Sequence, residues 1–254
     1  MEVHQHSHLA SGETHTERKK WTHYFWEFFM LFLAVTAGFF VENQREHYVE
    51  LKREKQYIKS FYEDLTADER DFQSNINFLR AQMQEADSLQ TLMMHITTKQ
   101  PANLIYMYLR SLPRGTSSLV FPNDRTIVQL RNAGGMRLIT NKGVSDSMVG
   151  YYRNVEIVHF LQEEGVINKR SLREKSMPLI NAEDFTKIID STDLIINPGE
   201  PIYLRNTDPD IINSCLIEVN RIKTLNSTLV RRIQSLKERA GRIKDFIKQE
   251  YHLK

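Results

Sequence analysis

Tyr24-Phe-Trp-Glu-Phe-Phe-Met-Leu-Phe-Leu-Ala-Val-Thr-Ala-Gly-Phe-Phe-Val41 is the segment that decides the fold. It carries no charge from Phe28 to Val41. As an α-helix the run would be about 27 Å long, close to the roughly 30 Å hydrocarbon thickness of a bilayer. Aromatic residues gather at both ends, where a ring can sit half in water at the membrane interface. We therefore expect one transmembrane helix over residues 21–41.

Two other interpretations of this segment stay open. A cleaved signal peptide would need a shorter apolar core and a small-residue cleavage site, and Ala34-Val-Thr-Ala-Gly38 is a weak one because apolar residues follow it. A buried core helix is the second alternative, since Glu27 interrupts the run. The concentration of Leu and Phe over this length favours the membrane span.

Composition indicates an all-α protein outside this segment. The chain has 254 residues with only 10 Gly and 7 Pro, and it is rich in strong helix formers. The balance of 34 Lys and Arg against 32 Asp and Glu does not indicate a nucleic-acid partner. The single cysteine, Cys215, excludes an intrachain disulfide.

We expect the transmembrane helix to be followed by an elongated helical bundle with long coiled-coil-like helices and at most one small β-hairpin. The hairpin would lie at Leu194–Leu204 and turn at Pro198-Gly199. A break in the first long helix is possible near Thr66, which forms a capping-box pattern with Glu69. The expected parts are a flexible His-containing tail (1–20), the membrane helix (21–41), a stalk of one or two helices (42–100), a helical core with an irregular segment (101–207) and a long C-terminal helix (208–254).

The C-terminal helix has the clearest periodicity. Asp208 is a candidate cap with Pro209 at the first helical position, and apolar residues then recur at steps of four and three. The one polar residue in this seam is Asn226, which we expect to fix coiled-coil register or partner number.

The N-terminal tail contains alternating histidines at His4, His6 and His8. Neutral imidazoles at this spacing can bind Zn²⁺ or another transition metal. The alternative is a solvated tail that binds metal only adventitiously, because nothing in the pattern supplies a second shell. Beyond this tail we expect no cofactor.

Glu27, Ala34 and Gly38 share one face of the membrane helix. Ala34 and Gly38 form a small-x-x-x-small pair that lets two helices approach closely, so we expect self-association with Glu27 hydrogen-bonded across the interface. The alternative for Glu27 is that its carboxylate reaches the headgroup region on its own.

Charges beside the span bear on its orientation. Arg18, Lys19 and Lys20 precede it directly and favour a cytoplasmic N-terminus, with the C-terminal domain in the periplasm of a bacterial inner-membrane protein. The C-terminal flank of the span mixes acidic and basic residues and hardly favours either orientation. From Arg221 onwards the chain has ten basic residues and three acidic ones. Anionic headgroups would attract this basic segment, which favours a cytoplasmic C-terminal domain instead.

Two stretches resemble a family of uncharacterised single-pass membrane proteins of Bacteroidota. One is the span with its exit, Trp21-Thr-His-Tyr-Phe-Trp to Glu46-His47. The other is Thr126-Ile-Val-Gln-Leu-Arg-Asn-Ala-Gly-Gly-Met-Arg-Leu-Ile139 together with Tyr151-Tyr152. The resemblance covers about half of the chain. It implies membrane anchoring and a helical core, and it brings no catalytic residues.

No enzyme motif is recognisable in the sequence, and we expect no catalytic activity. The first functional hypothesis is a membrane-anchored helical scaffold that associates with itself or with another membrane protein and contacts the lipid bilayer. The second is a sensor-like ligand-binding domain, with a pocket near Tyr151 and Tyr152, that signals through a partner. The third is metal handling by the His-rich tail.

Overall fold

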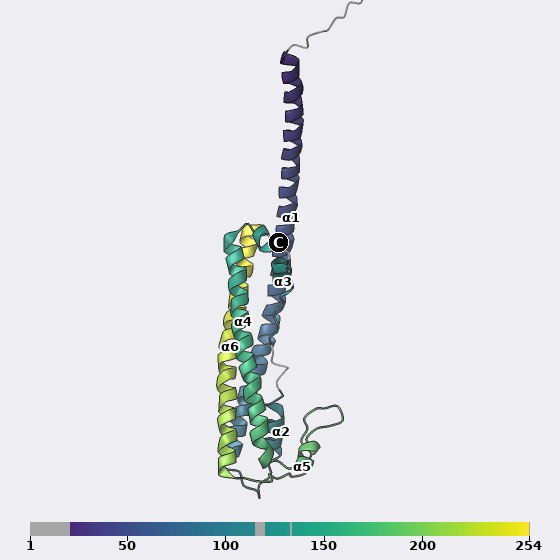
Figure 1. Cartoon of the computed structure of the whole chain (residues 1–254). Helices are drawn as coiled ribbons and strands as arrows, with labels where there is room; N and C mark the ends of the chain where they lie inside the picture. Colours follow the sequence, from purple (N-terminus) through teal and green to yellow (C-terminus); the bar gives the residue numbers. More distant parts are fainter. Residues whose placement is uncertain (1–20, 115–119, 133, 254) are drawn as a thin grey trace, which may run out of the picture. The chain divides into compact units, whose positions relative to one another are not determined.

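The computed structural model describes residues 21–114, 120–132 and 134–253. It is all-α, as predicted (Figure 1). The chain divides into unit 1, Met1–Lys52, and unit 2, Arg53–Lys254, and the first helix contributes residues to both. The helices are α1 (Trp21–Met93), α2 (Asn103–Ser111), α3 (Arg125–Asn132), α4 (Lys142–Ser176), α5 (Ala182–Lys187) and α6 (Pro209–Tyr251), with 3-10 turns η1 (Gly135–Leu138) and η2 (Met177–Leu179).

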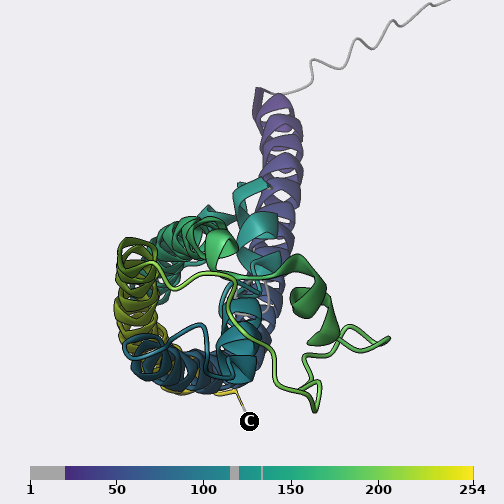
Figure 2. The ribbon, with the colours of Figure 1, turned by 90° about the horizontal axis from the view of Figure 1, so that it is seen from below.

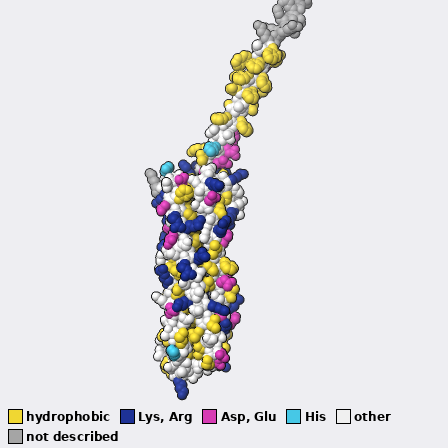
Figure 3. Space-filling view, turned by 90° about the vertical axis from the view of Figure 1, so that its left-hand side faces the viewer, with side chains coloured by type: hydrophobic (Ala, Val, Ile, Leu, Met, Phe, Trp, Pro, Cys, Tyr) yellow, Lys and Arg dark blue, Asp and Glu magenta, His cyan; other side chains and the backbone are white. Residues whose placement is uncertain are grey.

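The described part of unit 1 is helix throughout, and its large apolar side chains are exposed. They gather along this helix on the face that the space-filling view shows (Figure 3). An 18-residue window of α1 has a mean hydropathy of 1.8, and none of that window is buried. By length and composition, α1 is the one helix in the described part of the chain that could cross a membrane.

Unit 2 is built on three long helical segments: α1 from Arg53 onwards, α4 and α6. Viewed end-on, α6 lies between α4 and α1 (Figure 2). Lys237 Nζ on α6 donates to Gln73 Oε1 on α1 at 2.7 Å, and about two turns further along α6 Lys244 Nζ pairs with Glu69 Oε2 at 2.6 Å. Because residue numbers rise along α6 as they fall along α1, these two helices are antiparallel.

The core of unit 2 consists of two apolar clusters with a polar layer between them. On α1, the first cluster ends at Leu79 and the second begins at Ala86. On α6, the second cluster ends at Ile222 and the first begins at Leu229. The layer between them holds four buried polar side chains of the long helices: Gln82 on α1, Gln162 and Lys169 on α4, and Asn226 on α6.

The predicted start of α6 agrees with the structure, and two other helix ends also have local signals in the sequence. Asp208 Oδ1 accepts hydrogen bonds from the backbone N–H groups of Asp210 and Ile211 at the start of α6, with Pro209 at the first position. Asn141 caps α4 by accepting from Val144 N. After α3 the chain reverses at Gly134, whose φ of 60° is a left-handed conformation that favours glycine.

The predicted break near Thr66 is absent, because α1 continues through it. The Thr66 hydroxyl donates to Tyr62 O within the helix and caps nothing. The acidic side chain that interrupts the apolar seam, Asp68, is fully buried and bonded to other segments of unit 2. Residues 53–93, which the sequence placed in a stalk, therefore belong to the compact unit.

The hairpin that the sequence allowed at Leu194–Leu204 does not form. The described residues contain no strand, only one isolated antiparallel bridge between Ile189 and Ile195. The later part of the segment pairs with the start of α2 instead: Ala102 N donates to Ile202 O at 2.8 Å, and Ile202 N donates to Asn103 Oδ1 at 3.0 Å. These contacts use the backbone groups that a hairpin partner would have needed.

Candidate functional site

The predicted association face of the membrane helix lies on the exposed surface of unit 1. Glu27 Oε1 is 2.9 Å from His23 Nε2, one turn earlier on the same helix. Ala34 and Gly38 are exposed, and a Cβ added at Gly38 would meet nothing within 4 Å. The face is therefore open to a neighbour, and self-association through it stays a prediction.

The candidate metal ligands His4, His6 and His8 lie outside the described residues, as do the flanking bases Arg18, Lys19 and Lys20. Among the residues that the structure does describe, no group of three or more His, Cys, Asp or Glu side chains could hold a metal ion. Metal binding by the tail stays a prediction.

Asn226 faces the interior of its own chain. Its Nδ2 donates to Gln82 Oε1 at 3.3 Å, and Lys169 Nζ donates to the same oxygen at 3.3 Å. One amide oxygen of α1 thus connects α4 and α6 in the polar layer. Burial lowers the pKa of the Lys169 ammonium to about 8, because the charged form loses its hydration.

Three buried carboxylates of α1 bind the starts of later segments. Asp68 Oδ1 accepts from the backbone N of Asn123 at 2.7 Å, and Asp64 Oδ2 accepts from the Thr126 hydroxyl at 2.5 Å, both at the beginning of α3. Glu54 Oε1 accepts from the backbone N of Thr140 at 2.8 Å, just before α4. Negative charge at helix starts is electrostatically favourable. We interpret these three carboxylates as structural, because each accepts hydrogen bonds from other groups of unit 2.

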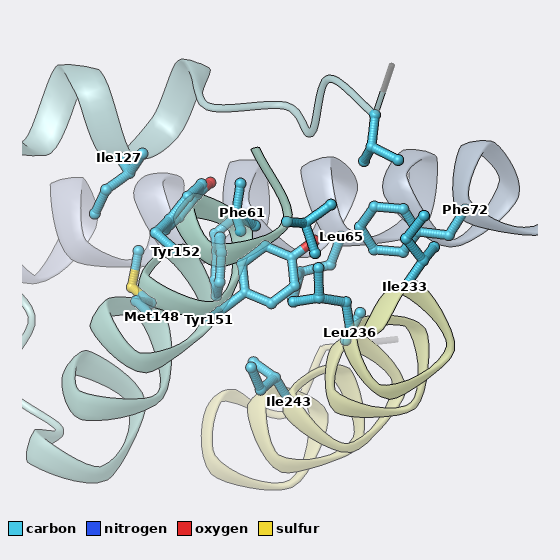
Figure 4. Close-up of a cluster of buried hydrophobic side chains, with 14 of the residues drawn as sticks. Phe61, Leu65, Phe72, Ile127, Met148, Tyr151, Tyr152, Ile233, Leu236 and Ile243 are labelled. Atoms are coloured by element: carbon cyan, nitrogen blue, oxygen red, sulfur yellow. The ribbon is translucent and has the colours of Figure 1, made fainter. Parts of the chain in front are cut away.

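Tyr151 and Tyr152 were the expected location of a ligand pocket, but they are core residues. Both rings pack against Phe61 of α1, with ring centroids 6.2 and 6.1 Å away, and Figure 4 shows Tyr151 near Leu65 as well. The Tyr151 hydroxyl donates to Asp68 Oδ2 at 2.6 Å, and the Tyr152 hydroxyl donates to Asn123 O at 2.8 Å. The two adjacent tyrosines therefore have a structural role, in packing and hydrogen bonding within the core.

A cavity of about 470 Å³ lies at the end of unit 2 formed by α2, α5 and the last turn of α4. Three arginines line it: Arg110 from α2, Arg114 from the segment that follows α2, and Arg173 from α4. One acidic residue, Asp193, shares the lining. The remaining lining is mainly apolar and consists of Leu109, Pro113, Ser176, Met177, Ile180 and Phe185.

Sequence reasoning missed this cavity. Its arginines come from two parts of the chain more than 50 residues apart, and each alone resembles an ordinary basic residue near a helix end. Arg110 and Arg114 are four residues apart, but Arg114 lies beyond the end of α2, so helical spacing gave no signal for the pair.

Comparison with known proteins gives no match: no family model, no curated protein and no solved structure is similar to the chain. The resemblance to single-pass membrane proteins of Bacteroidota therefore stays a prediction.

Proposed function

We propose that this protein is a membrane-anchored helical interaction protein, held in the bilayer by the first part of α1, whose unit 2 provides the interaction surface. One observation carries the proposal: the contrast between the two parts of α1. Phe28, Leu31 and Phe39 are 66, 67 and 79% exposed, whereas Ile58, Phe61 and Leu65 are completely buried.

The exposed apolar part of α1 has to be shielded from water. Soluble proteins rarely expose apolar patches larger than a few hundred Å², and a band of about twenty mostly apolar residues exceeds this on every side of the helix. Lipid covers all sides of a helix at once. The helix also satisfies its own backbone hydrogen bonds, as a membrane interior requires.

Cell fractionation tests the anchor. The full chain should sediment with membranes and resist extraction by alkaline carbonate. A Leu33→Lys/Val35→Lys variant should move toward the supernatant, because each charge near the centre of a span costs about 2.5–3.5 kcal/mol. The matched control is Phe160→Lys/Leu194→Lys, which changes two side chains of unit 2 that are 62 and 63% exposed. Wild-type protein in the supernatant without detergent would refute the anchor.

For orientation, we propose a cytoplasmic N-terminus and a periplasmic unit 2 in a bacterial inner membrane. The basic C-terminal part of α6 is the counter-argument. Tyr251 OH donates to Glu54 Oε1 at 2.5 Å, so α6 ends beside the residues with which unit 2 begins. Two of its lysines, Lys237 and Lys244, are occupied by Gln73 and Glu69 of α1, which leaves less charge for headgroups.

Labelling with a membrane-impermeant maleimide tests the orientation. Cys215 cannot report it, because its side chain is completely buried. A Ser191→Cys variant places a thiol on an exposed turn of unit 2. It should react in cells whose outer membrane alone is permeabilised. Reaction only after the inner membrane is opened would reverse the proposed orientation.

We further propose that Ala34 and Gly38 pair two copies of the membrane helix. A Gly38→Leu substitution should lower the oligomer mass measured by light scattering in mild detergent, because the larger side chain separates the two backbones. Thr36→Leu, on the opposite side of the helix, is the matched control. Equal masses for both variants and wild type would remove this role.

A further inference from the structure

The cavity at the α2–α5 end of unit 2 has an excess of positive charge that its own residues do not compensate. Arg114 is engaged by Asp193: its Nη1 donates to the Asp193 backbone O and its Nη2 to Oδ1, both at 2.9 Å. Neither Arg110 nor Arg173 has a carboxylate within ion-pair distance among the described residues. Three guanidinium groups thus share one aspartate.

The two arginines without a carboxylate are held in place by weaker contacts. The Arg110 guanidinium lies over the Phe185 ring, 4.7 Å from its centroid. Arg173 Nη2 donates to Pro113 O at a long 3.4 Å. Both contacts orient a planar group and leave most of its five N–H donors available to a ligand.

The arginines are close enough to repel one another. Burial and the charge of Arg114 lower the pKa of the Arg110 guanidinium, Asp193 opposes this change, and Arg173 adds a smaller lowering. The partial negative charges at the C-terminal ends of α2 and α4, about half a charge each, offset part of the excess. Roughly one positive charge is left in a concave, partly apolar space, and an anion is the group that would relieve the repulsion.

Shape and lining narrow the kind of anion. A single forked guanidinium suffices for a flat carboxylate, whereas several guanidinium groups converging from different helices match the three terminal oxygens of a phosphate monoester. A volume of about 470 Å³ is within the range of small-molecule sites and is larger than phosphate alone requires. Leu109, Met177 and Ile180 offer an apolar wall for the rest of such a molecule.

We propose that this cavity binds a small organic phosphate, with the phosphate on Arg110 and Arg173 and an apolar group against Leu109, Met177 and Ile180. Arg114 keeps its bond to Asp193 and closes one side of the site. Asp193 has a positive φ of 64°, and its turn is held by Asp190, whose Oδ1 accepts from Thr192 N at 2.8 Å and from Leu194 N at 3.0 Å. The wall of the cavity is therefore built before the ligand arrives.

Phenyl phosphate is the probe, titrated calorimetrically into the full chain in non-ionic detergent, with inorganic phosphate as the comparison. Phenyl phosphate should bind at least about tenfold more tightly than inorganic phosphate. Burying the phenyl ring contributes more free energy than RT ln 10, which is the free energy of a tenfold change in affinity. No heat with phenyl phosphate, or equal affinity for the two probes, would overturn the proposal.

Substitutions identify the site. Arg173→Gln and Arg110→Gln should each weaken phenyl phosphate binding about tenfold or more, as expected for a charged hydrogen-bond donor. Arg110→Lys should restore part of the loss by returning the charge without the fork. The control is Arg170→Gln, an exposed arginine on the same helix as Arg173 that does not line the cavity. If the Arg173 and Arg170 variants bind equally well, at unchanged melting temperatures, the cavity is not the site.

A phosphate monoester can also be carried by a lipid headgroup, as in phosphatidic acid. The full chain is therefore titrated in vesicles of phosphatidylcholine with and without phosphatidic acid. A free organic phosphate as ligand predicts the same phenyl phosphate affinity in both vesicles. Loss of binding only where phosphatidic acid is present would overturn the free ligand in favour of the lipid. These readouts do not depend on the membrane anchor, so they can fail independently of it.

Discussion

Replacing Tyr151 by Phe tests the buried hydrogen bond that joins α4 to α1. The substitution deletes only the hydroxyl that donates to Asp68 Oδ2 at 2.6 Å. A hydrogen bond to an ionised group contributes about 1.5–3 kcal/mol to stability, and its loss leaves a buried carboxylate oxygen without that donor. We therefore expect the free energy of unfolding near neutral pH to fall by about 1.5–3 kcal/mol.

The loss should depend on pH. Burial raises the pKa of the Asp68 carboxyl, and the Tyr151 and Asn123 hydrogen bonds oppose that rise. An acid whose pKa is higher in the folded state contributes stability that is lost as pH rises through the folded pKa. Removing the Tyr151 donor raises that pKa further, so the variant should lose more stability than wild type as pH rises from the unfolded pKa of about 4 through the raised folded pKa.

The matched control is Tyr152→Phe, which removes the neighbouring hydroxyl that donates to the Asn123 carbonyl at 2.8 Å. A bond between neutral groups contributes about 0.5–1.5 kcal/mol, and this one has no titrating partner in that pH range. Urea unfolding of the full chain in non-ionic detergent, followed by circular dichroism across a pH series, compares the two variants. Equal losses for both, or a loss at Tyr151 that does not change with pH, would refute the reasoning.

Three further outcomes are expected. Cys215 should not react with a thiol reagent until the protein is denatured, because burial raises its thiol pKa to about 11 and leaves about one thiolate in ten thousand at neutral pH; rapid labelling of the native chain would contradict this. Lys169→Met should raise the free energy of unfolding at neutral pH by an amount of the order of 3 kcal/mol, because it removes the cost of burying the ammonium. This difference from wild type should shrink from about pH 8 to about pH 10.5, as the folded wild type releases the Lys169 proton. A difference in urea unfolding that stays constant with pH would contradict it. Gly134→Ala should cost about 1–2 kcal/mol in the same assay through its left-handed φ alone, since a Cβ there meets nothing within 4 Å; an unchanged midpoint would contradict it.

Much of the secondary structure could be predicted because its signals are local. The cap and proline at Asp208-Pro209, the Asn141 cap and the glycine after α3 each act within one turn of helix. The seam of α6 was equally readable, and all ten of its predicted positions are buried: Cys215, Val219, Ile222, Asn226, Leu229, Ile233, Leu236, Ala240, Ile243 and Ile247. Periodicity determines which face is buried but does not say against what.

The errors arose where a distant partner decides the outcome. Asp68 lies in the apolar seam beside the predicted break at Thr66, and a charged residue in such a seam is costly without a partner. Its partners, Asn123 and Tyr151, are 55 and 83 residues away, and they make the charge compatible with an unbroken helix. Gln82 is likewise buried in α1, because Asn226 and Lys169 supply donors for its amide oxygen.

The sequence by itself determined the helical class, the start of α6 and the one segment apolar enough to cross a bilayer, because each depends on residues that are neighbours along the chain. Only the tertiary structure decided that α1, α4 and α6 pack together, that Asn226 is satisfied within its own chain, and that Arg110, Arg114 and Arg173 share one cavity. The role of a buried polar or charged group depends on the group that it contacts, and that group can come from any part of the chain.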